Sequence, residues 1–199
     1  MEAFESFVAV ALEQEGYVVS EAVKFPVARK TGKVAYVEIQ RHGYEVDLVG
    51  ARANRLVLAT VKSFFGSQGV RWQDVKGEPG AKNRKSYALL NDPALRDQII
   101  EAAAERYGYK VKQVELHLYV GHFAAPKLKL HEPVIREWAA EELAGGGPIK
   151  VIGLSEIADS VIEAATVKQY RDNAVVVTIK ALDDAGRIAG REGATVLHS

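Results

Sequence analysis

Apolar and polar positions alternate through two neighbouring stretches near residue 50, and this alternation predicts a pair of strands. In residues 44–50 and 56–64 the apolar side chains recur at every second position, with Val46 and Leu48 on one face of the first strand. A period of two is typical of strands that have two different faces. Residues 52–55 interrupt the apolar run, which indicates a hairpin turn between the strands.

The turn also fixes which residues we expect to face one another. If the chain reverses between residues 53 and 54, the numbers of paired residues sum to 107. Asp47 then lies opposite Thr60, and Glu45 lies opposite Lys62. Directly opposed residues have β-carbons about 5 Å apart. Two carboxylates, a hydroxyl and an ammonium group are therefore expected on one face of the hairpin.

The same reading along the rest of the first 125 residues predicts a helix, three strands, a helix and a strand. Asp92 as N-cap, Pro93 at the first helical position and Gly108 after the last one mark the second helix clearly. The glycine-rich stretch 66–80 predicts an extended loop, in which Trp72 either packs on the core or stacks on a base. The elements expected are a helix over 3–15, strands over 17–29, 34–47 with a bend at residues 42–43, and 56–64, a helix over 93–107, and a strand over 114–120.

The C-terminal part, residues 126–199, is expected to be a mainly helical extension that packs on the core or continues it. Gly145 to Pro148 indicates a flexible joint, and Ser155 is expected to be the N-cap of a helix. The β-branched run 175–178 suits either a strand or a last helix capped by Asp172. The other elements expected here are a helix over 133–143, a strand over 149–154 and a helix ending near residue 167.

Composition excludes several classes of protein. The chain of 199 residues has no cysteine, so disulfides, thiolate zinc sites and cysteine nucleophiles are excluded. No signal sequence or membrane-spanning stretch is visible, and a cytoplasmic location with no membrane partner is expected. The five histidines do not have the spacing of a zinc helix, and no phosphate-binding glycine motif occurs.

Charge is balanced overall, with 26 basic and 26 acidic residues, but it is unevenly distributed. Residues 62–87 hold six basic and two acidic side chains, directly after the second strand of the hairpin, whereas residues 131–163 hold two basic and seven acidic ones. A basic block in this place suits a phosphate backbone, and a solvated loop is the alternative. The residues expected to bind nucleic acid are Arg71, Lys76, Lys82, Arg84 and Lys85.

The hairpin resembles the core of the PD-(D/E)XK nuclease superfamily, in which an Asp ends one strand and Glu-x-Lys lies on the next. Asp47 and Lys62 match that Asp and Lys, and the run Leu56 to Ser63 resembles the strand that carries Glu-x-Lys. Glu5, with Leu12 to Tyr17 after it, resembles the first helix. Thr60 stands where the family has an acidic residue. The resemblance covers residues 4–65 and, by element order, residues up to 123.

This resemblance implies a restriction-endonuclease-like fold, with an α-β-β-β-α-β core over residues 1–125 and a mixed sheet flanked by helices. It implies a metal-dependent DNA endonuclease or exonuclease, with Asp47, Lys62 and Glu5 as catalytic residues. The Mg²⁺ or Mn²⁺ ligands would be Asp47, Glu5, Glu45 and the carbonyl of Val61. Duplex or branched DNA is the expected partner, and a homodimer is one arrangement for cutting two strands.

The acidic residue that Thr60 replaces leaves three alternatives open. Glu45 supplies the missing carboxylate from the same strand face, or Asp74 or Glu78 supplies it from the basic block, or nothing replaces it. In the third case the chain is a catalytically inactive nuclease-like protein that binds nucleic acid or a protein partner. A surface ion pair between Glu45 and Lys62 accounts for part of the pattern without any metal.

Overall fold

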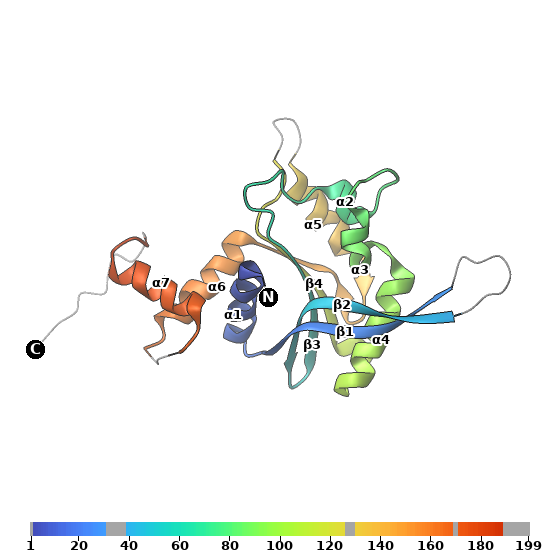
Figure 1. Cartoon of the computed structure of the whole chain (residues 1–199), viewed down its shortest axis with the longest axis horizontal. Coiled ribbons are helices and arrows are strands. Elements are labelled where there is room, and N and C mark those ends of the chain that lie inside the picture. Colours follow the sequence, from blue (N-terminus) through green and yellow to red (C-terminus); the bar gives the residue numbers. More distant parts are fainter. Residues whose placement is uncertain (1, 31–38, 126–129, 169–170, 189–199) are drawn as a thin grey trace, which may run out of the picture.

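The computed structural model describes residues 2–30, 39–125, 130–168 and 171–188 as an α/β protein (Figure 1). Its first half has the order helix, three strands, helices, strand. The elements are α1 (Ala3–Gln14), β1 (Val18–Lys30), β2 (Ile39–Arg52), β3 (Arg55–Lys62), α2 (Trp72–Lys76), the 3-10 turn η1 (Arg84–Tyr87), α3 (Ala88–Asn91), α4 (Pro93–Tyr107), η2 (Val111–Gln113), β4 (Val114–Val120), α5 (His131–Glu141), β5 (Leu143–Ala144), β6 (Gly147–Pro148), β7 (Lys150–Gly153), α6 (Leu154–Thr166) and α7 (Ala174–Asp184).

Five strands form one mixed sheet in the order β1-β2-β3-β4-β7. β1, β2 and β3 are antiparallel neighbours, whereas β4 lies parallel to β3 and β7 lies parallel to β4. The β2–β3 pairs run from Arg52–Arg55 to Leu48–Ala59, which confirms the predicted register over these residues but ends one residue before the predicted pair of Asp47 with Thr60. The antiparallel strands β2 and β3 are joined by a turn of two residues, while the parallel connections pass through helices.

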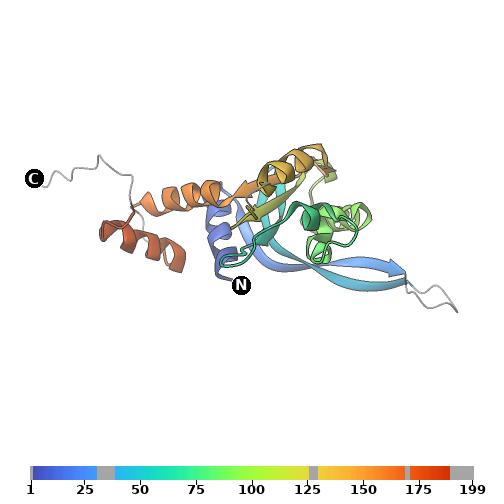
Figure 2. The same ribbon diagram turned by 90° about the horizontal axis from the view of Figure 1, so that it is seen from above.

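Helices cover both faces of the sheet (Figures 1 and 2). Val57, Ala59 and Val61 of β3 point to the side where α1 and α6 pack, which we call the α1 face. Leu56 and Leu58 point to the other side, where α4 and α5 pack, which we call the α4 face. Alternate side chains of β3 therefore enter two separate hydrophobic clusters, as expected for a strand buried on both sides.

The alternation breaks in β2 next to the hairpin site. The β1–β2 pairing skips Ala22 and Asp47, and Ala22 has a φ of 49°, which is uncommon for a residue with a β-carbon. On either side of this point Val46 packs on the α4 face and Leu48 packs on the α1 face. The prediction that these two residues share a face is therefore wrong: the β1–β2 register is the same on both sides of the skipped pair, but the face that β2 buries changes there.

The end signals of α4 are confirmed. The Asp92 side chain accepts a hydrogen bond from the Leu95 N–H at 3.2 Å, and Pro93 is the first helical residue. Gly108 ends the helix with a φ of 75°, the left-handed conformation that glycine adopts without a steric cost.

Other boundaries need correction. The predicted loop over residues 66–80 contains α2, which ends at Lys76 with Gly77 as its C-cap. β2 runs from residue 39 through residues 42–43 without the predicted bend, and residues 34–38 of that prediction lie outside the described residues. Ser155 is not the N-cap of α6; Gly153 is, because its N–H donates to the Glu156 carboxylate at 2.8 Å.

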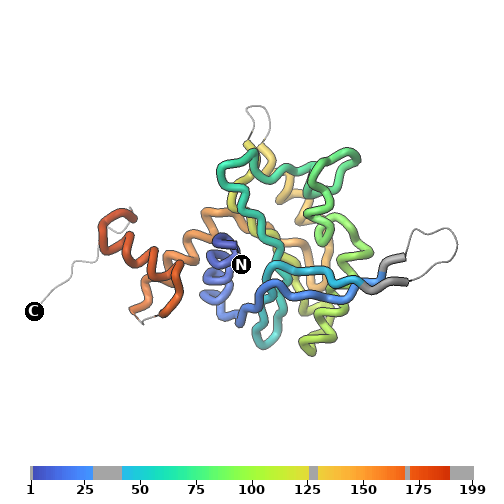
Figure 3. Tube along the Cα trace, in the orientation of Figure 1, coloured from blue at the N-terminus to red at the C-terminus, as the bar shows by residue number. Residues whose placement is uncertain are grey.

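The C-terminal part returns to the sheet through β7 before it continues into α6 and α7 (Figure 3). Gly145 to Pro148 is not a flexible joint, because β5 and β6 form a tight antiparallel hairpin whose Gly146 N–H donates to the Val114 carbonyl at 2.7 Å. The run 175–178 belongs to the helix α7, and its cap is Asn173 rather than Asp172.

Candidate functional site

The candidate site lies where β2 and β3 separate, just beyond their last pair. The Asp47 carboxylate accepts a hydrogen bond from the Val61 N–H at 2.7 Å and one from the Lys62 Nζ at 3.4 Å. The side chains of Asp47 and Lys62 are 25% and 19% exposed, so the pair is partly shielded but open to solvent. The strand backbone and the ammonium group together hold the carboxylate in place.

Lys62 is oriented by further contacts. Its Nζ donates to the Val61 carbonyl at 3.0 Å and lies 6.0 Å from the centre of the Tyr87 ring. Tyr87 is buried on the α4 face, and burial, followed by the charge of Asp74, raises the pKa of its hydroxyl. The phenol is therefore neutral at physiological pH, and its ring supports the ammonium group as a cation–π partner.

Glu5 is not joined to this pair. It lies in the first turn of α1, where its carboxylate accepts a hydrogen bond from the Glu2 N–H at 3.0 Å as part of a capping box. Among the described residues it makes no hydrogen bond with Asp47 or Lys62. The turn that carries it does reach the carboxyl end of β3, because the Phe4 ring packs edge-on against Phe65 with 5.2 Å between the ring centres.

The predicted pairing of Glu45 with Lys62 is wrong. Glu45 lies opposite Lys24 of β1, and its carboxylate lies 3.6 Å from the Lys24 Nζ. The register that sums to 107 ends at Leu48, since β2 then leaves β3 and continues with β1 alone. Both side chains of this ion pair are more than half exposed, so the pair contributes little stability.

Neither Thr60, which occupies the position of the missing acid, nor Asp74, one of its proposed replacements, is open to solvent. Thr60 is only 6% exposed, between Ala59 and Val61. Asp74 is 2% exposed, and its carboxylate accepts hydrogen bonds from Arg71 at 3.0 Å and from the Asn83 N–H at 3.0 Å. These bonds hold the segment around Asn83 against α2, so Asp74 has a structural role.

The basic block divides into engaged and open side chains. Arg71 is paired with Asp74, and the Lys76 Nζ lies 5.4 Å from the centre of the Trp72 ring. Trp72 packs against the cluster on the α4 face, which confirms its packing role. Within this block, three exposed cations form no ion pair with any described residue: Lys82, Arg84 and Lys85.

The hairpin offers few metal ligands. Both contacts to Asp47 use Oδ2, and Oδ1 receives no hydrogen bond from any described residue. No group of three or more metal-binding side chains occurs within the described residues. One carboxylate oxygen with the adjacent Val61 carbonyl fits a Mg²⁺ ion that keeps most of its waters, the usual state of Mg²⁺ at phosphate sites, and does not fit a closed protein cage.

A second polar group, which the sequence showed only as the polar positions of β4, lies inside the α1 face. The Glu115 carboxylate contacts Arg55 at 2.8 Å, Lys150 at 2.8 Å and the His117 Nε2 at 3.0 Å, and the His117 Nδ1 lies 3.2 Å from the Tyr119 hydroxyl. The hydrogen bond from His117, aided by Lys150, lowers the pKa of Glu115 to about 2. Burial lowers the pKa of His117, so the ring is neutral, donates from Nε2 and accepts from Tyr119.

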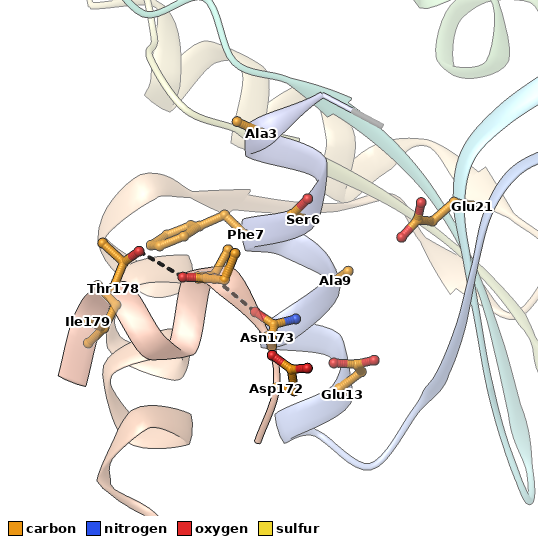
Figure 4. Close-up of a pocket in the computed structure, with 12 residues that line it drawn as sticks. Ala3, Ser6, Phe7, Ala9, Glu13, Glu21, Asp172, Asn173, Thr178 and Ile179 are labelled. Atoms are coloured by element: carbon orange, nitrogen blue, oxygen red, sulfur yellow. Dashed lines mark hydrogen bonds between the residues drawn. The ribbon is translucent and has the colours of Figure 1, made fainter. Parts of the chain in front are cut away.

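A cavity of about 550 Å³ lies between α1 and α7 (Figure 4). Three carboxylates line it, those of Glu13, Glu21 and Asp172, and Glu13 is paired with Arg171 outside the lining. An acidic cavity of this kind repels phosphate, so we do not assign nucleic-acid chemistry to it.

Comparison with known proteins adds no assignment: no protein family, curated sequence or solved structure matches this chain. Within the described residues, no helix combines the length and apolar composition that crossing a bilayer requires.

Proposed function

We propose that the chain is a metal-dependent DNA nuclease of restriction-endonuclease-like architecture, acting at Asp47 and Lys62. The observation that carries the proposal is the contact among the Asp47 carboxylate, the Val61 backbone and the Lys62 ammonium at the point where β2 and β3 separate. The element order and the mixed sheet support the same architecture.

In this proposal each residue has one task. The Asp47 Oδ1 and the Val61 carbonyl would hold the cation, which supplies polarisation of the phosphate and an activated water. Lys62 would stabilise the negative charge that develops on the attacked phosphate, and its contact with the Tyr87 ring keeps it near the carboxylate. Glu5 remains a predicted ligand only if its carboxylate leaves the cap of α1.

The open cations extend the site toward a longer substrate. Lys82, Arg84 and Lys85 are exposed and unpaired among the described residues, so they are free to neutralise phosphates. Arg71 and Lys76 are held by Asp74 and Trp72 and would contribute less. A positively charged surface of this kind binds DNA with a strong dependence on salt.

A cleavage assay tests the proposal directly. Purified protein is incubated with single-stranded, linear duplex and branched DNA in Mg²⁺ or Mn²⁺, beside Asp47→Ala, Lys62→Ala and Glu5→Ala. Lys112→Ala serves as the matched control. Lys112 is exposed in η2, which precedes β4, so it lies at the end of the parallel strands away from Asp47. We expect metal-dependent cleavage that falls at least about 100-fold in the first two variants and is unchanged in the control.

Absence of cleavage under every metal condition, or equal cleavage by all variants, would refute the nuclease proposal. The inactive alternative then makes its own prediction: DNA binding that weakens steeply with salt and falls in a Lys82→Ala, Arg84→Ala, Lys85→Ala variant. Thr60→Glu separates the two cases further. A chain that lost its metal through this position should gain Mg²⁺ binding when the carboxylate is restored, measurable by calorimetry.

A further inference from the structure

The strands β1 and β2 continue as a two-stranded ribbon after β2 has left β3. The β2–β3 pairs end at Leu48, whereas the β1–β2 pairs run on to Lys30–Ile39. Figures 1 and 2 show the two strands extending together past the rest of the sheet. We call the paired residues 24–30 and 39–45 the ribbon. At about 3.4 Å per residue, each of its two segments is roughly 24 Å long, so the ribbon reaches well beyond the candidate site.

The outer edge of the ribbon is closed to a further strand. The Gln98 side chain of α4 accepts a hydrogen bond from the Ala28 N–H at 2.9 Å, and Arg106 of α4 donates to the Lys24 carbonyl at 3.1 Å. Pro26 lies between these two positions and has no N–H. A protein that added a strand to this edge would have to displace α4, so the ribbon does not suit partners that bind by strand addition.

One face of the ribbon is buried and the other is open. Phe25 and Val27 are 0% and 2% exposed in the cluster on the α4 face, and Tyr44 packs against the same cluster. On the other face Pro26 and its partner Gly43 are exposed. Among the described side chains of the ribbon, the aromatic rings therefore all belong to the buried face. The open face lacks the aromatic platform on which proteins stack the bases of single-stranded nucleic acid.

The ribbon concentrates positive charge in a chain that is neutral overall. Its cations are Lys24, Arg29, Lys30 and Arg41, and its one acidic residue is Glu45. The Glu45 carboxylate lies 3.6 Å from the Lys24 Nζ, and both side chains are more than half exposed. A pair so open to water is weak, so a phosphate can take the place of the carboxylate. The ribbon therefore offers a surface that attracts a polyanion.

Duplex DNA fits this surface better than a single strand or a partner protein does. The ribbon has neither a stacking platform for the single strand nor a free edge for the protein. Its paired strands lie about 5 Å apart, and the major groove of B-DNA, about 12 Å wide, admits a two-stranded ribbon between two rows of phosphates. At about 3.4 Å per base pair, the length of the ribbon corresponds to roughly seven base pairs.

We propose that the ribbon binds duplex DNA next to the segment that enters the candidate site, and that Arg29, Lys30 and Arg41 neutralise its phosphates. This inference rests on the proposed function and names its substrate class: duplex DNA that extends at least about seven base pairs beyond the attacked phosphate. Asp47 lies at the base of the ribbon on the same strand, two residues after Glu45, so one duplex can contact both.

Binding without metal tests the inference apart from cleavage. Fluorescence anisotropy in EDTA, at rising salt, measures the affinity of the full chain for a labelled duplex of about 20 base pairs and for the single strand of the same sequence. The ribbon variant combines Arg29→Ala, Lys30→Ala and Arg41→Ala. The control variant makes the same change in charge elsewhere, at three exposed lysines that form no ion pair with any described residue: Lys110→Ala, Lys112→Ala and Lys168→Ala.

We expect the ribbon variant to weaken duplex binding about tenfold at about 100 mM salt and to lower the salt slope by about three, one for each lost phosphate contact. The control variant should change duplex binding less than about twofold, and single-strand binding should change less than about twofold in both variants. Equal losses of duplex binding in the ribbon and control variants, no loss in the ribbon variant, or an equal loss for the single strand would overturn the inference.

A gain of affinity guards against a ribbon variant that fails to fold. Glu45→Gln removes the one carboxylate of the ribbon and releases Lys24, so we expect it to strengthen duplex binding about threefold. Unchanged or weaker binding by Glu45→Gln would contradict the inference. Failure of the nuclease proposal appears separately, as absence of cleavage in Mg²⁺ with ribbon-dependent binding intact in EDTA. Metal-dependent cleavage by a chain whose duplex binding ignores the ribbon would refute the inference alone.

Discussion

Replacing Glu115 with Gln tests whether the polar group inside the α1 face stabilises the fold through a charged carboxylate. Glu115 connects three strands, because it contacts Arg55 on β3, His117 on β4 and Lys150 on β7. Glu115→Gln keeps the shape of the side chain and removes its charge. The comparison therefore isolates the electrostatic part of the group.

The lowered pKa of Glu115 sets the size of the effect. A fall from 4.5 to about 2 corresponds to about 3 kcal/mol of stability in the ionised state. Arg55 and Lys150 are 40% and 49% exposed, and solvent weakens their share, so we expect Glu115→Gln to cost about 2 kcal/mol at neutral pH. Since the folded pKa is the lower one, this contribution is complete above about pH 4.5 and is lost as the pH falls toward 2.

Urea unfolding followed by circular dichroism, at pH values from about 7 to about 2.5, measures the difference between wild type and variant. The difference should stay near 2 kcal/mol down to about pH 5 and shrink below about 1 kcal/mol at the acid end. Glu105→Gln is the control, because Glu105 is exposed on α4 and forms no ion pair among the described residues. Parallel pH profiles for wild type and Glu115→Gln would refute the reasoning.

Two further substitutions test local features of the fold. Asp92→Ala removes the hydrogen bond to the Leu95 N–H and should lower the free energy of unfolding by about 1 kcal/mol in the same urea assay, and an unchanged value would contradict the capping role. Gly145→Ala places a β-carbon 2.4 Å from the Val114 carbonyl oxygen at a φ of 61°, so it should cost about 2 kcal/mol or more, whereas a joint that moves freely would tolerate the change.

The sequence predicts local features well where one signal decides the outcome. The β2–β3 register follows from the position of a two-residue turn, and α4 follows from Asp92, Pro93 and Gly108. These signals act between residues close in the chain, so no tertiary contact can override them easily.

Predictions failed where distant contacts decide. The predicted register extends past Leu48, but β2 leaves β3 there and continues with β1 alone. Asp74 looked like a free carboxylate in the basic block, although folding brings Arg71 and Asn83 onto it. The polar positions of β4 alternate with apolar ones, which by itself indicates a strand face open to solvent. They indicate a buried polar group only once both faces of the sheet are known to be covered.

β7 also has a consequence for how the chain can be dissected. This strand comes from the last third of the sequence, yet its backbone pairs with residues 117–120 of β4. A fragment that ended before β7 would present that side of β4 as a bare, apolar strand, ready to pair with the same strand of another molecule. The chemistry proposed at Asp47 must therefore be tested in a chain that keeps its C-terminal segment, because a shorter one would aggregate through the strand next to β3.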